Sequence, residues 1–154
     1  MLGMIESLAK ENPDSALRLL DSLPASALKY REYRSRATIA EAEVRYQKSQ
    51  IMDKDSLLSE ALDFYRLRER DPRRQRAYYL SGYQHYLKEE YGNAILDYLN
   101  AEHTASLTAD TLALGLIYRE IGNTFKRMED YTNSFDFFKK SHDMFKACNA
   151  EKYY

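Results

Sequence analysis

Two stretches of this 154-residue chain, forty residues apart, carry the same spaced pattern of small and aromatic residues. The first copy consists of Tyr78, Gly82, Ala94, Tyr98 and Ala101, and the second of Tyr118, Gly122, Ser134, Phe138 and Ser141. In both copies the tyrosine lies four residues before the glycine, and the later positions lie 12, 16 and 19 residues after it. Small residues let two helices approach closely while aromatic rings fill the space beside them, so the pattern predicts a helical hairpin that is used twice. Repeated hairpins are typical of stacked solenoids, which usually provide binding surfaces.

The composition agrees with an all-α fold. Five Gly and three Pro offer little material for the frequent turns of an all-β domain. The 23 basic and 24 acidic residues give a formal charge of −1, so no net field draws this segment to nucleic acid or to an anionic membrane. The 14 tyrosines suit both helix interfaces and wet binding grooves, because a tyrosine ring is apolar while its hydroxyl forms hydrogen bonds.

Apolar residues recur with helical spacing along most of the chain. Asn12-Pro13 and Asp71-Pro72 are helix start signals, each with a capping side chain followed by proline. The pattern predicts eight helices, over 1–11, 13–23, 26–49, 55–69, 72–89, 91–106, 108–128 and 131–147. Short polar connections predict four antiparallel hairpins. In the last hairpin we expect Leu112, Ile117, Ile121 and Phe125 to face Phe135, Phe138 and Phe145.

The two patterned stretches resemble the tetratricopeptide repeat, a 34-residue helical hairpin. The five residues of each copy stand at positions 4, 8, 20, 24 and 27 of that repeat. Ile121 and Phe125 match its positions 7 and 11, whereas His85 replaces the usual aromatic residue at position 11. The resemblance covers about half of the chain and implies a right-handed superhelix of stacked hairpins.

Upstream the resemblance is weaker and the spacing uneven. The segment from Asn12 to Leu23 is similar to the opening of tetratricopeptide regions in bacterial regulators and anchored proteins. The expected organisation is one repeat domain, with degenerate hairpins over 1–23 and 26–69 and clearer repeats over 72–106 and 108–147. Residues 149–154 look like the start of a truncated further helix. We expect Phe137 and Met144 to need a cover, which suggests a fragment of a longer array or pairing of this end with another copy.

The resemblance also points to a binding groove. In the family, the inner face is lined by positions 2, 5, 9, 12 and 13 of each first helix. The corresponding residues here are Arg76, Tyr79, Tyr83, Tyr86 and Leu87 in one repeat, and Leu116, Arg119, Asn123, Lys126 and Arg127 in the next. A tyrosine column beside a cationic column suits a peptide or helix with apolar and acidic groups. The alternative is that these tyrosines only pack between neighbouring hairpins.

Other residue groups favour structural roles. Six arginines between 66 and 76 could hold phosphate or an acidic peptide, but solvated or internally paired arginines are the favoured interpretation. The three histidines lack metal-ligand spacing, and no phosphate loop or nucleophile motif appears, so we expect no metal site, no cofactor and no enzyme activity. Cys148, the only cysteine, is expected to be an inert packing residue.

The expected function is that of a protein-interaction scaffold that binds a peptide or helix of a protein partner in its concave groove. The alternative is a sensory or oligomerising segment of a larger signalling or transcriptional regulator, which predicts homodimers through the uncovered C-terminal end. No apolar run reaches the ~20 residues of a membrane span, and the N-terminus lacks the pattern of a signal peptide. We therefore expect a soluble segment, which leaves open a soluble part of a membrane-anchored parent.

Overall fold

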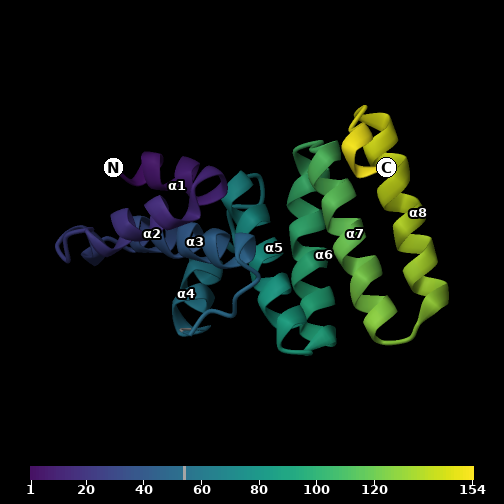
Figure 1. Ribbon diagram of the computed structural model, residues 1–154, viewed down its shortest axis with the longest axis horizontal. Coiled ribbons are helices and arrows are strands. Elements are labelled where there is room, and N and C mark those ends of the chain that lie inside the picture. The colour runs from purple at the N-terminus through teal and green to yellow at the C-terminus, as the bar shows by residue number, and fades with distance from the viewer. Residues whose placement is uncertain (54) are drawn as a thin grey trace. The chain divides into compact units, whose positions relative to one another are not determined.

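A computed structural model describes residues 1–53 and 55–154 (Figure 1). Over these residues the chain contains eight α-helices and no strand. The helices are α1 (Leu2–Glu11), α2 (Pro13–Asp21), α3 (Arg31–Gln47), α4 (Asp55–Tyr65), α5 (Pro72–Leu87), α6 (Tyr91–Leu107), α7 (Thr111–Arg127) and α8 (Tyr131–Ala147), with short 3-10 turns η1 (Ala27–Lys29) and η2 (Glu151–Tyr153). Consecutive helices pack as the pairs α1–α2, α3–α4, α5–α6 and α7–α8, which confirms the predicted all-α fold.

The chain divides into two compact units, Met1–Arg68 and Glu69–Tyr154. In the first unit, α1 and α2 both pack on α3. Helix α4 also packs on α3, as the second helix of the α3–α4 hairpin. The centre of this packing is a cluster of small and branched residues, Ile5, Ala9, Ala16, Ala40 and Val44. Leucines of α1 and α2 and the following loop surround the cluster and stay partly buried. Within α2, Ala16 is buried in this core, whereas the leucines pack against it and stay partly exposed.

Helix starts follow the predicted capping chemistry. The side chain of Asn12 accepts a hydrogen bond from the Ser15 amide at 3.2 Å, and that of Asp71 accepts one from the Arg73 amide at 2.8 Å, with proline next in the chain in both cases. Asp110 and Asp130 cap α7 and α8 in the same manner, at 3.0 and 3.2 Å. A capping oxygen satisfies an amide that the first helical turn leaves without a partner, so these residues favour the starts of α2, α5, α7 and α8.

The four helices of the second unit end in the same backbone turn, which the residue types at these positions do not indicate. Glu89, Ala109, Glu129 and Asn149 all adopt positive φ, between 52° and 61°. In each case the next amide donates back to a carbonyl five residues earlier, as from Asp130 to Phe125 at 3.0 Å. This left-handed closing turn is usually made by glycine. Its recurrence every twenty residues accounts for the forty-residue interval between the two patterned hairpins.

The patterned glycines of the second unit lie under aromatic rings of the following helix. A Cβ atom on Gly82 would lie 2.7 Å from the Tyr98 ring, and one on Gly122 would lie 2.7 Å from the Phe138 ring. Ser134 and Ser141 replace alanine in the second copy, and their hydroxyls donate to the carbonyls of Gly122 at 3.0 Å and Gly115 at 2.7 Å. Close approach of the helices therefore needs the small residues, and the serines add hydrogen bonds across the same contacts.

The last hairpin departs from the expected pairing in register. The prediction that Leu112 and Phe135 face the partner helix is wrong, because Phe135 is 69% exposed and Leu112 is also exposed. Phe137 takes the inward position and stacks on Phe125 with ring centroids 5.6 Å apart. The cover predicted for Phe137 thus comes from its own hairpin. The segment 149–154 contains η2, whose Tyr153 stacks on Phe145 with ring centroids 4.9 Å apart.

Candidate binding surface between α5 and α7

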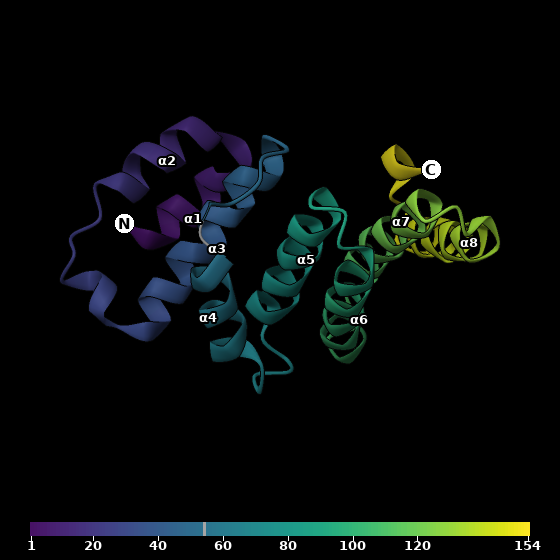
Figure 2. The same cartoon turned by 90° about the horizontal axis from the view of Figure 1, so that it is seen from below.

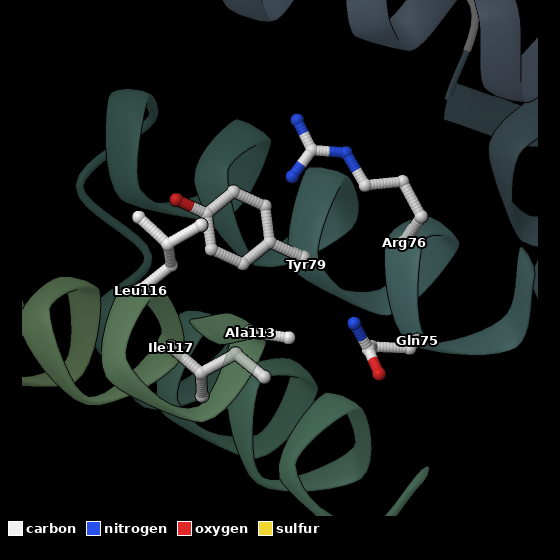
Figure 3. Close-up of a pocket in the computed structure, with 6 residues that line it drawn as sticks. All are labelled: Gln75, Arg76, Tyr79, Ala113, Leu116 and Ile117. Carbon is white, nitrogen blue, oxygen red and sulfur yellow. The ribbon is translucent and has the colours of Figure 1, made fainter. Parts of the chain in front are cut away.

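A small pocket opens between α5 and α7 in the second unit (Figure 3). It is lined by Gln75, Arg76 and Tyr79 from α5 and by Ala113, Leu116 and Ile117 from α7. Its cavity volume, about 20 Å³, is far below the range typical of small-molecule sites, roughly 300–1,000 Å³. The pocket is a shallow recess with room for about one water-sized group. Because α5 and α7 are the first helices of the two patterned hairpins, the pocket lies on the face that the sequence indicated.

Tyr79 connects the pocket with the core. Its side chain is only 3% exposed, and its ring lies 5.8 Å from the ring of Tyr98. The guanidinium of Arg76 lies 4.7 Å above the Tyr79 ring, and Figure 3 shows the Tyr79 hydroxyl extending toward Leu116. Tyr79 is thus a core residue whose edge lines the pocket, with a cation held at the rim by the aromatic face.

The other two tyrosines of the predicted groove form an aromatic row further along α5. Tyr83 and Tyr86 stack with centroids 6.2 Å apart, and Tyr91 lies 6.1 Å from Tyr86. Burial raises the pKa of Tyr86. Arg127 donates from its Nε to the Tyr91 hydroxyl at 3.3 Å and closes the row at the end of α7. The structure therefore brings Tyr83 and Tyr86 together as a half-buried aromatic surface.

The predicted residues of α7 have unequal roles. Arg119 pairs through Nε with the buried carboxylate of Glu120 at 3.3 Å, and its guanidinium lies 5.7 Å from the Tyr153 ring. Asn123 is half-buried and Lys126 is exposed. Arg119 is thus held within the unit by a carboxylate and an aromatic ring, whereas Lys126 extends into solvent as a cation on the same helix.

The pocket also contains residues that the family pattern did not indicate, namely Gln75, Ala113 and Ile117. Their neighbours in the sequence, Arg76 and Leu116, were predicted site residues. Helical geometry could have indicated these three residues. Residues three or four positions apart lie on the same face of a helix, and the residues next to them lie at the edges of that face. Residue 113 lies three positions before Leu116, and its small side chain leaves the space that the pocket occupies.

Arginines between residues 66 and 76 contact carboxylates, carbonyls and an aromatic ring of the same chain, in agreement with the favoured interpretation. In the first unit, Arg66 lies 3.6 Å from the Asp63 carboxylate, and the guanidinium of Arg68 lies 4.4 Å above the Phe64 ring. In the second, Arg70 donates to the Leu107 carbonyl at 3.0 Å. The buried Arg74 donates to the Asn100 carbonyl at 2.7 Å and to the Thr104 hydroxyl at 2.8 Å. The contacts of Arg70 and Arg74 join the start of α5 to the end of α6, whereas Arg66, Arg68 and Arg70 remain exposed.

A polar cluster lies between α5 and α6. Ser81 donates to the Asp97 carboxylate at 2.5 Å, and His85 lies between Asp97, at 3.5 Å, and Glu90, at 2.8 Å. Only 16% of the Asp97 side chain is exposed. Burial raises the pKa of Asp97, although the Ser81 hydrogen bond and the nearby His85 act in the opposite direction.

The variant Asp97→Asn is expected to be more stable than the wild type at pH 7, because the amide keeps an acceptor for Ser81 without a buried charge. Since the folded-state pKa of Asp97 is raised, its protonation favours the folded state, and this contribution is lost as the pH rises through that pKa. The advantage of the variant should therefore shrink as the pH falls from 7 toward the ordinary value of 3.8. Urea unfolding across this range measures it, with the exposed Asp136→Asn as the control. An Asp97→Asn protein that is less stable than the wild type at pH 7 would contradict the conclusion that the buried Asp97 charge destabilises the folded state.

Among the described residues, no group of three or more His, Cys, Asp or Glu side chains is arranged to hold a metal ion. Over the same part of the chain, no helix combines the length and apolarity needed to cross a membrane. Comparison with family models, with curated proteins and with solved structures finds no match for this chain.

Proposed function

We propose that the unit Glu69–Tyr154 is a protein-interaction module that binds a peptide or helix of a partner on the α5–α7 face. The observation that carries the proposal is the pocket between these helices, which combines an apolar floor with a cation at its rim. Tyr79, Leu116 and Ile117 would contact an aliphatic side chain of the partner. The guanidinium of Arg76, held over the Tyr79 ring, would pair with a carboxylate next to that side chain.

The size and composition of this face support a peptide ligand. The pocket can take only the tip of one partner side chain, so most of the affinity has to come from the surface around this anchor point. The half-buried tyrosine row and the exposed Lys126 extend this surface along both helices. Helices packed through glycine–aromatic contacts hold the face rigid, which lowers the ordering cost that binding imposes on the receptor.

A random peptide library displayed on phage, panned against the whole chain, tests the proposal. We expect enrichment of peptides with an aliphatic residue beside an acidic one, because these groups match the pocket floor and Arg76. Leu116→Glu places a charge at the pocket, and it should weaken an enriched peptide at least tenfold in fluorescence anisotropy, since burial of an unpaired carboxylate is costly. Arg76→Glu should weaken acidic peptides by a similar factor through charge repulsion.

The control is Leu96→Glu, a matched change at a leucine of α6 that is already 61% exposed. It should bind the enriched peptides as the wild type does, and all three variants should keep the helical circular dichroism of the wild type. Equal binding by the Leu116→Glu and Leu96→Glu variants would show that the peptides bind elsewhere. Failure of the library to enrich any motif would count against peptide binding by this unit.

A further inference from the structure

We propose that two copies of this chain associate through one exposed face of α8, with the two α8 helices antiparallel. This inference does not rest on the proposed peptide site, which lies between α5 and α7. Figure 2 shows α8 at the outer edge of the unit Glu69–Tyr154, beside α7. The pairing that the sequence suggested relied on Phe137, which the structure places inward, so the face proposed here is a different side of α8. This α8 face consists of exposed residues that recur at helical spacing, namely Tyr131, Phe135, Lys139, His142 and Lys146.

The forty-residue repeat within the chain indicates that this side of the helix is suited to packing. On α6, Tyr91 and Glu102 each form a hydrogen bond with a side chain of α7, at 3.3 and 2.8 Å. The residues forty positions later are Tyr131 and His142 of the α8 face. The side that α7 covers on α6 is therefore exposed on α8, where Tyr131 is 65% and Phe135 is 69% exposed. Removal of these rings from water would favour association.

Pairing two α8 helices in opposite directions brings unlike halves of this face together. The N-terminal half carries the aromatic rings of Tyr131 and Phe135, whereas the C-terminal half carries Lys139, His142 and Lys146. With a two-fold axis between positions 138 and 139, Tyr131 lies opposite Lys146 of the second copy, and Phe135 lies opposite its His142. The lysine then rests over the tyrosine ring as a cation–π pair, and the imidazole packs on the phenyl ring. Each contact forms twice, because a two-fold interface is self-complementary.

Charges along one edge of the α8 face favour a second copy as the occupant. Asp136 and Lys139 are both exposed and lie three positions apart, so they share this edge. In the antiparallel register, Asp136 of each copy is offset from Lys139 of the other by only two residues, about 3 Å along the axis. Two ion pairs therefore flank the two-fold axis, and they fix direction and register more than they add affinity. The adjacent Lys140 lies 4.7 Å above the Phe137 ring of its own chain.

The size of the face limits the strength of this dimer. The 17 residues of α8 span about 25 Å, and one helix face of this length lies at the small end of specific interfaces. We therefore expect a dissociation constant on the order of 10–100 µM. Unfolding measurements at about 1 µM chain report on the monomer, which keeps them independent of this interface.

Sedimentation velocity of the whole chain, over concentrations that bracket this dissociation constant, tests the inference. The average mass should rise from 18.1 kDa toward twice that value. Phe135→Lys should weaken association at least tenfold, because it places a cation opposite the basic half of the second copy. The matched control is Leu96→Lys, at a residue of α6 that is 61% exposed, and it should associate as the wild type does. Both variants should keep the helical circular dichroism of the wild type.

Two charge reversals test the antiparallel register. Lys139→Glu leaves an acidic pair at each edge contact and Asp136→Lys leaves a basic pair, so each variant alone should associate about fivefold more weakly than the wild type. An equimolar mixture of the two variants should recover association, because the acidic edge of one then meets the basic edge of the other.

Three results would overturn the inference. The first is a wild-type chain that stays monomeric at every concentration. In that case a helical peptide that binds the wild type but not the Phe135→Lys variant would assign the α8 face to another protein. The second is association of the Phe135→Lys variant as strong as that of the wild type, which would place the contact elsewhere. The third is a mixture of the two charge variants that associates no more strongly than either variant alone.

Discussion

Phe145→Ala is expected to lower the free energy of unfolding of the unit Glu69–Tyr154 by about 3–5 kcal/mol, the usual cost of truncating a buried phenylalanine. The Phe145 ring is 1% exposed and lies against Gly115 on one helix and Tyr153 in η2. Its loss leaves a cavity between α7 and α8 that the backbone cannot readily fill, and it removes the stacking partner of η2. Urea unfolding followed by circular dichroism measures the change.

The matched control is Phe135→Ala on the same helix. Because the Phe135 ring is largely exposed, its truncation should change stability by no more than about 0.5 kcal/mol. Hydrogen exchange should locate the effect of Phe145→Ala in α7, α8 and η2 and leave the protection of α3 unchanged, since α3 belongs to the other compact unit. Equal losses from the two phenylalanines would show that the register of α8 described above is wrong.

Gly115→Ala is expected to destabilise the same unit by about 2 kcal/mol, although alanine is the better helix former by about 1 kcal/mol. A Cβ atom at residue 115 would lie 2.5 Å from Cε1 of Phe145. That ring is enclosed by Tyr153 and the α7–α8 packing, so the helices must separate, and overpacking of this kind typically costs about 1–3 kcal/mol. Separation would also stretch the Ser141 hydrogen bond to the Gly115 carbonyl. Chemical denaturation measures the net effect.

Gly92→Ala is the control for Gly115→Ala, because a Cβ at residue 92 of α6 would meet nothing within 4 Å. This variant should be neutral or more stable, by up to about 1 kcal/mol, through reduced freedom of the unfolded chain. In the Gly115→Ala background, Phe145→Leu should cost less than it does alone, since the smaller side chain relieves the overlap. A Gly115→Ala protein as stable as the wild type would mean that α7 and α8 are not in the close contact described.

Much of the fold could be predicted from the sequence because its signals are local. Asn12 and Asp71, each followed by proline, identified two helix starts, since capping needs only a side-chain oxygen near the first amides. Helix ends were harder to predict. Glu89, Ala109 and Glu129 adopt left-handed backbone without being glycine, so their identities do not reveal the turns. Packing of the flanking helices makes up for the cost of that conformation.

The candidate sites, too, could be predicted only in part from the sequence. The resemblance to the tetratricopeptide repeat implied that Arg76, Tyr79 and Leu116 share a face, and these three residues line one pocket. The depth of Tyr79, by contrast, depends on the Tyr98 ring from the next helix. A second pocket, in the first unit, was not predicted, since it arises where α2, η1 and α3 leave space between them. Such space depends on distances between helices, which periodicity does not encode.

By itself, the sequence determined that this chain forms helices, that most of them pair with their neighbours, and that Gly82 and Gly122 mark close contacts. The physical reason is that helical period, caps and small–aromatic spacing act within one or two turns of the chain. Only the tertiary structure decided that Phe137 rather than Phe135 turns inward, that Arg74 of the arginine-rich segment is buried against α6, and that two separate pockets form. These outcomes depend on which side chains from distant segments occupy the same volume, and close packing between helices is what selects among them.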